Sequence, residues 1–183
     1  MLRPLNPLKR FLRRPAGAAG SGEIYGVIVA QARLPAFYRA VGVPDTLEGR
    51  FSVLTLHLFA VLHRIKSEGA AGRPLAQDLM DRFSKDIETV LRELGVSDLK
   101  IPKKMRALAG SSLGQLETYE VALGEGSEAL QAAIAAALPL DEDKAEAVSV
   151  RLAVYLQDMV RALKQQSPAA LNAGQVFFPE ISA

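Results

Sequence analysis

Apolar residues recur every three or four positions along most of the chain, and this spacing predicts helices rather than strands. The run from Leu47 to about residue 67 has apolar side chains at the helical period and further ones on its other faces. A second run, from Pro74 to Gly95, has one apolar stripe and a charged outer face. No segment shows sustained alternation of apolar and polar residues with turn chemistry between the runs. We therefore predict an all-α fold, a single-domain bundle of about six or seven helices.

Polar residues and prolines predict where the helices begin. We expect Ser21 to cap a first helix that extends from about residue 22 to residue 32. Asp45 precedes Glu48 by three residues and has the form of a capping box for the long helix after it. A short helical turn is predicted between these two helices, and later helices are expected to begin near residues 98, 127 and 141.

The composition divides the chain into three parts. Residues 1–22 combine leucines, basic residues and a glycine- and alanine-rich end, and they predict a basic flexible N-terminal segment. Residues 23–166 carry the helical patterns and form the predicted domain. Residues 167–183 are predicted to be an extended C-terminal tail, which we expect to dock on the domain through its apolar residues: Val176, Phe177 and Phe178.

The charge is unevenly distributed along the chain. The formal net charge is +2, from 22 basic and 20 acidic residues. Five basic residues precede the first acidic one: Arg3, Lys9, Arg10, Arg13 and Arg14. The remainder has an excess of acidic residues, so the domain itself does not have the charge of a DNA-binding protein, and we expect no specific DNA binding. The five basic residues are a candidate contact for a ribosome or for an anionic membrane surface, the alternative being a solvated tail.

Few residues of the chain are suited to catalysis or metal binding. The chain has no cysteine, which excludes disulfides, thiol catalysis and thiolate metal sites. Its two histidines, His57 and His63, are six residues apart and do not form the pair of a helical metal site. Each is more typical of a hydrogen-bonded structural histidine. Phosphate-binding loops and nucleophile elbows are absent from the sequence, so we predict no catalytic residue, no metal and no cofactor.

Two stretches of the chain are distinctive. The first is Tyr25-Gly26-Val27-Ile28-Val29-Ala30-Gln31-Ala32-Arg33, and the second is Val43-Pro44-Asp45-Thr46-Leu47-Glu48-Gly49-Arg50-Phe51. Together with Pro35–Tyr38 and Leu56–Phe59 they resemble the ubiquinol–cytochrome c chaperone family, whose members are assembly factors for the cytochrome bc complex (complex III). The resemblance extends over about Ile24–Leu123.

This resemblance implies an assembly chaperone that binds newly made cytochrome b and has no enzymatic activity. Mitochondrial members of the family work with a small partner subunit and, in some cases, at the ribosomal exit, so such contacts are possible partners here. Because the chain lacks a long presequence, we expect the bacterial branch of the family. The expected location is an alphaproteobacterial cytoplasm, peripheral to the inner membrane, or the mitochondrial matrix if the source is eukaryotic.

We expect the client-binding residues to lie in and beside the second distinctive stretch. A helper of an unassembled membrane protein has to offer apolar surface, and large aromatic side chains are typical anchors of such a surface. The predicted anchors are Phe37, Tyr38 and Phe51, with Arg50 and His57 as polar groups for selectivity and Asp45 beside them. The apolar helix that begins at Leu47 is expected either to be central to the domain or to cover a partner.

Two other functions remain open from the sequence alone. One is an adaptor that binds ribosomes or membrane surfaces without specificity for cytochrome b, and its binding would weaken steeply with salt. The other is an enzyme acting on quinone or haem, which would require a cleft with convergent polar groups and strongly shifted pKa values.

Overall fold

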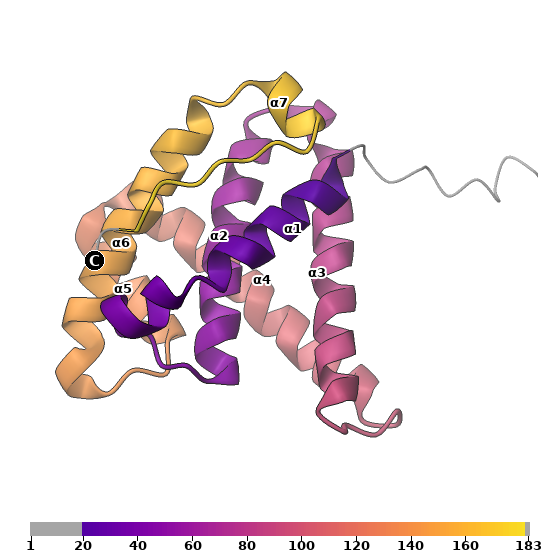
Figure 1. Ribbon diagram of the computed structural model, residues 1–183, viewed down its shortest axis with the longest axis vertical. Helices are drawn as coiled ribbons and strands as arrows, with labels where there is room; N and C mark the ends of the chain where they lie inside the picture. The colour runs from indigo at the N-terminus through magenta and orange to yellow at the C-terminus, as the bar shows by residue number, and fades with distance from the viewer. Residues whose placement is uncertain (1–19, 182–183) are drawn as a thin grey trace, which may run out of the picture.

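The apolar run that begins at Leu47 forms α2 (Leu47–Lys66), which passes through the middle of the molecule (Figure 1). The computed structural model describes residues 20–181. Most of the side chains of α2 are buried, so this helix is the central core helix, one of the two roles expected for it. Four apolar side chains of α2 stay at least partly exposed: Leu47, Phe51 and Leu54 in its first turns and Leu62 near its end.

The other helices surround α2. Within residues 20–181 there are seven α-helices and no strand, which confirms the all-α prediction. They are α1 (Ser21–Ala32), α3 (Arg73–Glu93), α4 (Ile101–Glu125), α5 (Ser127–Ala137), α6 (Glu142–Lys164) and α7 (Pro168–Asn172), with a π-helical turn η2 (Phe37–Val41) and a 3-10 turn η3 (Gly69–Ala71).

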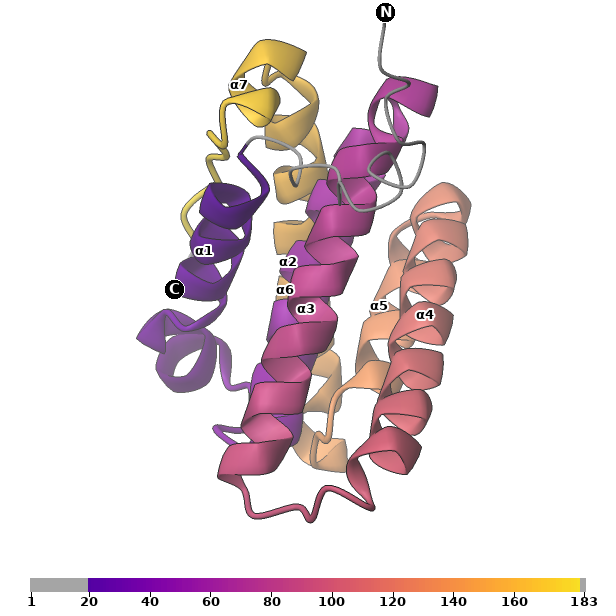
Figure 2. The ribbon, with the colours of Figure 1, turned by 90° about the vertical axis from the view of Figure 1, so that its right-hand side faces the viewer.

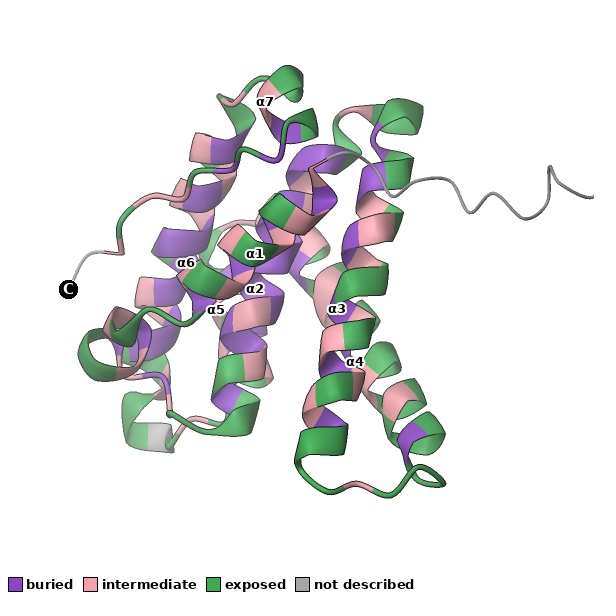
Figure 3. Ribbon diagram, turned by 45° about the vertical axis from the view of Figure 1, so that its right-hand side comes forward, coloured by how far each residue is buried: buried purple, intermediate pink, exposed green. Residues whose placement is uncertain are grey.

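The helices pack in an order that leaves α3 and α4 divergent. α1 packs on α2 and α3, α6 packs on α2, and α5 lies between α4 and α6. Figures 1 and 2 show that α4 leaves the end of α3 and crosses behind α2 at an angle to α3. The inner faces of the helices are buried and their outer faces are exposed, as Figure 3 shows by colour.

Two of the predicted helix caps are wrong. Ser21 is the first residue of α1 rather than its cap; Gly20 takes the N-cap position with a φ of 88°, and buried Ser21 accepts a hydrogen bond from Arg82. At α2 the cap is Thr46, whose hydroxyl accepts a hydrogen bond of 3.1 Å from the Gly49 amide. Asp45 is left free to pair with Arg50.

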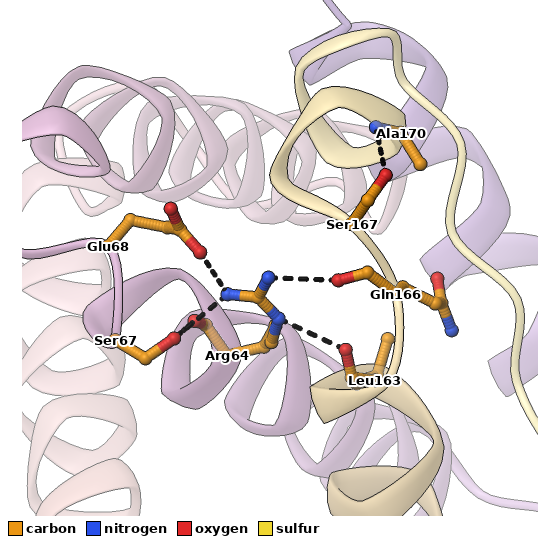
Figure 4. A network of polar contacts seen from close by, with 7 residues as sticks. All are labelled: Arg64, Ser67, Glu68, Leu163, Gln166, Ser167 and Ala170. Atoms are coloured by element: carbon orange, nitrogen blue, oxygen red, sulfur yellow. Dashed lines mark hydrogen bonds and ion pairs between the residues drawn. The ribbon is translucent and has the colours of Figure 1, made fainter.

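A buried arginine joins the end of α2 to the end of α6 (Figure 4). The Arg64 guanidinium donates to the Leu163 carbonyl at 3.0 Å and to the Gln166 carbonyl at 2.9 Å, and it pairs with Glu68. The Gln166 side chain in turn bonds both the amide and the carbonyl of Phe177. These bonds satisfy carbonyls at the end of α6 and position the chain that follows it.

The sequence predicted that residues 167–183 would be extended, but only part of this segment is. Residues 168–172 form α7, capped by the Ser167 hydroxyl, and the chain is extended only after it. The expected docking is confirmed for Val176, which is buried, and for Phe178, which packs on the core, whereas Phe177 is 66% exposed.

Residues 1–19 of the basic N-terminal segment, with Arg3, Lys9, Arg10, Arg13 and Arg14, lie outside the described residues, so the predicted contacts stay predictions. The last two residues of that segment, Ser21 and Gly22, belong to α1. Among residues 20–181, no helix is both long enough and apolar enough to cross a bilayer.

Candidate functional site: an apolar groove between α2, α3 and α4

A groove of about 560 Å³ opens where α4 diverges from α3. Its volume lies within the range of about 300–1,000 Å³ that is typical of ligand sites. We call it the α2–α4 groove, and its lining comes from five helices and the η2 turn: Val29, Ala32, Arg33, Tyr38, Leu47, Glu48, Arg50, Phe51, Ser52, Leu54, Asp86, Ile87, Val90, Leu91, Leu108, Ser111, Gln115 and Ala137.

The floor of the groove is apolar. Phe51 stacks on Phe83 of α3 with ring centroids 5.7 Å apart, and Leu54 lies one turn further along α2. Val90 on α3 and Leu108 on α4 face them across the groove and are only partly buried. The Ser52 hydroxyl bonds the Ala137 carbonyl at 2.8 Å, which fixes the end of α5 against this part of α2. The groove therefore offers apolar side chains on a scaffold of packed helices.

One rim of the groove carries a cation held in place by two neighbours. The Arg50 guanidinium bonds Asp45 at 2.5 Å and lies 5.0 Å from the centre of the Tyr38 ring. The Tyr38 hydroxyl donates to the Ala32 carbonyl at 2.6 Å, and burial raises the pKa of Tyr38. These contacts place Arg50 at the edge of the apolar floor.

Further charged groups of both signs lie along the groove. The Tyr25 hydroxyl donates to Asp86 at 3.0 Å, and burial, with the Asp86 charge, raises the pKa of Tyr25. Arg33 and Glu48 complete the charged groups at the edge. An apolar floor edged by both cations and anions suits the side of an amphipathic or membrane-derived helix better than a small charged ligand.

Two predicted client-binding residues lie in the core instead. His57 and Phe37 are fully buried, with ring centroids 5.2 Å apart. The Nδ1–H of His57 donates to the Val53 carbonyl at 2.8 Å, so its Nε2 accepts from the Tyr155 hydroxyl at 3.1 Å. Burial lowers the pKa of His57 to about 4.

His57 is therefore a hydrogen-bonded structural histidine, as its isolated position suggested. In this conformation neither His57 nor Phe37 presents a surface to a partner. Direct contact of His57 and Phe37 with a client stays a prediction, and the burial of both side chains argues against it.

The structure brings together three of the predicted client-binding residues, Tyr38, Arg50 and Phe51, with Asp45 behind Arg50. Sequence reasoning missed the α3 and α4 side of the groove: Ile87, Val90, Leu108 and Gln115. Their apolar members were assigned to the helix stripes that form the core, because periodicity does not show where two helices diverge. Among residues 20–181 no group of histidine, aspartate and glutamate side chains is arranged to hold a metal ion.

Comparisons with known proteins agree on one family. The family model described as ubiquinol-cytochrome C chaperone matches residues 39–178. The crystal structure of the Cbp3 homolog from Brucella abortus has a TM-score of 0.78 and 35% identity, and the match covers 95% of this chain and 97% of that chain.

Two curated relatives are ubiquinol-cytochrome c reductase complex assembly factor 1 from Xenopus laevis and from Mus musculus. They are 24% and 23% identical over 112 residues, which is 61% of this chain. The matched part spans 56% of the Xenopus protein and 38% of the mouse protein.

Proposed function

Because the chain belongs to the ubiquinol-cytochrome C chaperone family, we propose that it acts in assembly of the cytochrome bc complex by binding newly made cytochrome b in the α2–α4 groove. The family confirms the resemblance in the sequence, and the curated relatives are complex assembly factors by name. The observation that carries the choice of site is the partly exposed apolar floor beside Arg50.

The chemistry of the client fits this floor. A membrane subunit that has not yet been assembled exposes apolar helix faces, and each face that enters the groove removes apolar surface from water. This removal contributes roughly 25 cal/mol per Å² before the costs of association. Phe51, Leu54, Val90 and Leu108 provide the complementary surface, and Arg50 limits how a helix can lie against it.

We propose that the protein works by binding and not by turnover, since its curated relatives are assembly factors by name. The further partners in this proposal are a small subunit and a ribosome or membrane surface. The proposed place of action is the side of the inner membrane where cytochrome b is made.

The groove is tested by two substitutions with a matched control. Leu47→Glu changes a half-exposed residue at the rim, and Leu108→Glu places a carboxylate on the floor. Leu113→Glu makes the same change on α4 at a residue that is 51% exposed and outside the groove. We expect the two groove variants to capture newly translated cytochrome b at least tenfold more weakly, whereas the control captures it normally.

The measurement is co-isolation of newly made cytochrome b after the membranes of a translation reaction have been dissolved in detergent, with helicity and thermal melting as checks of folding. In a host that lacks the gene, haem spectra of the membranes should show selective loss of the bc complex, which the control variant restores. Equal capture by all three variants would rule out the groove, and an unchanged bc complex in the gene deletion would rule out the function.

A further inference from the structure

The turn between α3 and α4 has a fixed conformation. We call residues 94–106 the α3–α4 tip. Gly95 has a φ of 75°, its amide donates to the Arg92 carbonyl at 2.9 Å, and the Val96 amide donates to the Leu91 carbonyl at 3.0 Å. This is the Schellman pattern of helix termination, and Val96 packs back against the core. The surface of the tip is therefore set by the fold rather than by a loose loop.

Two leucines project from this tip into solvent. Leu99 is 95% exposed, more than any other large apolar side chain among residues 20–181, and Leu94 is 59% exposed. The exposure of both side chains results from their place in the turn, since Leu94 lies at the end of α3 and Leu99 lies just before α4. A single exposed leucine needs no explanation, but two exposed leucines on one fixed turn form a small apolar patch at the end of the molecule.

Basic residues surround these leucines. The tip has one acidic residue, Asp98. Its four basic residues are Lys100, Lys103, Lys104 and Arg106. Asp98 is paired with Arg92 of α3, and within the described part of the chain none of the four forms an ion pair. Outside the N-terminal segment the chain has more acidic than basic residues, so this cluster is a local reversal of charge.

The position of these charges is unfavourable for the helix that carries them. They lie in the first turns of α4, which has no acidic residue in its first turn. Cations near the N-terminus of a helix oppose its dipole and destabilise it by a few tenths of a kcal/mol each or more. The basic cluster is therefore not explained by the stability of α4. An external anionic surface would offset the unfavourable interaction of these cations with the helix dipole.

The tip lies at one end of the molecule, beside the α2–α4 groove. Figures 1 and 2 show the turn at the lower end of α3, whereas α1 begins toward its other end. Leu91 and Leu108, which flank the tip in the chain, both line the groove. A surface that binds the tip therefore also lies near the mouth of the groove.

We propose that the α3–α4 tip is a docking surface for an anionic lipid bilayer. Leu94 and Leu99 enter the headgroup region, and Lys100, Lys103 and Lys104 lie against the lipid phosphates. The two exposed leucines favour a lipid surface over nucleic acid, which basic residues alone would also attract. This site is distinct from the basic N-terminal segment, and it stands whether or not the groove binds cytochrome b.

The test is flotation of the full chain with two kinds of vesicle, one of phosphatidylcholine alone and one of phosphatidylcholine with phosphatidylglycerol, whose headgroups give the surface a negative potential. One variant combines Lys100→Glu, Lys103→Glu and Lys104→Glu. Its matched control combines Arg39→Glu, Arg73→Glu and Lys164→Glu, three exposed residues away from the tip. A third variant, Leu99→Ser, leaves the charge unchanged and cannot disturb the core because the side chain is exposed.

We expect the wild-type chain and the control to bind the anionic vesicles and not the neutral ones. The tip reversal should weaken binding at least tenfold, and Leu99→Ser should weaken it several-fold, with unchanged thermal melting. Equal binding by the tip and control triples, or no binding by the wild type, would overturn the proposal. The proposal would also be overturned if the same three lysines bound a duplex RNA and the protein did not bind the anionic vesicles. Capture of cytochrome b in detergent reports on the groove alone, so the two proposals fail separately.

Discussion

At the scale of single residues, His57 shows how a polar side chain is used to order this core. Its two ring nitrogens connect Val53 on its own helix to Tyr155 on α6, and the Tyr155 hydroxyl also accepts from Gln31 of α1 at 3.0 Å. One buried imidazole thus connects three helices through hydrogen bonds that require its neutral form. The same burial raises the pKa of Tyr155 to about 12, so both partners stay uncharged at neutral pH.

This arrangement predicts a loss of stability in weak acid. The pKa of His57 is about 4 in the folded chain and 6.5 as its ordinary value. The unfolded chain therefore binds a proton first as the pH falls, and stability is complete above pH 6.5 and declines from there toward pH 4. Between pH 8 and pH 5 the loss from this group is about 2 kcal/mol.

The measurement is urea denaturation at pH 8 and pH 5 for the wild type and for His57→Gln. We expect the substitution to lower stability at pH 8 and to flatten the pH dependence between the two values. The same slope in both proteins would show that His57 does not control it.

At the scale of elements, the stretch from Val43 to Phe51 explains why its residues form a recognisable motif. Thr46 caps α2, Asp45 fixes Arg50, and Phe51 reaches the groove floor. Gly49 is required because a β-carbon there would lie 2.1 Å from the Pro44 carbonyl oxygen. The first part of the motif therefore shapes the entry into α2, and the part from Leu47 onward also contributes to the lining of the groove.

Two glycine substitutions separate close packing from helix propensity. Gly49→Ala should destabilise the fold by about 2 kcal/mol or more, because the backbone at Pro44 has to move. Gly26→Ala in α1, where a β-carbon meets nothing within 4 Å, should stabilise it by about 0.5–1 kcal/mol. Thermal melting of the two variants checks both signs. A neutral Gly49→Ala would mean that the entry into α2 is more pliable than the structure shows.

At the scale of the whole molecule, periodicity predicted the fold class and most of the core, as the buried stripe of α3 shows: Leu75, Leu79, Phe83, Ile87 and Leu91. It did not predict the groove, because that depends on the angle between α3 and α4. It also did not predict the buried Arg64, which looks like an ordinary surface residue in the sequence. Two of its partners are carbonyls about a hundred residues away, and only folding brings them together.

The C-terminal segment gives a prediction at this scale. Phe178 packs edge-on against His57 with ring centroids 5.2 Å apart, whereas the neighbouring Phe177 is largely exposed. Phe178→Ala should cost about 1–3 kcal/mol, and Phe177→Ala less than about 0.5 kcal/mol. Chemical denaturation of the pair measures the difference, and equal values would show that the segment contributes little to the core.

The same segment has a consequence for how the molecule is made. Val176 and Phe178 follow all seven helices in chain order, so a ribosome delivers them after the helices against which they pack. Until they emerge, the aromatic cluster around His57 lacks Phe178, whose ring packs edge-on against the imidazole. We therefore expect the core around His57 to close only after Val176 and Phe178 have been made.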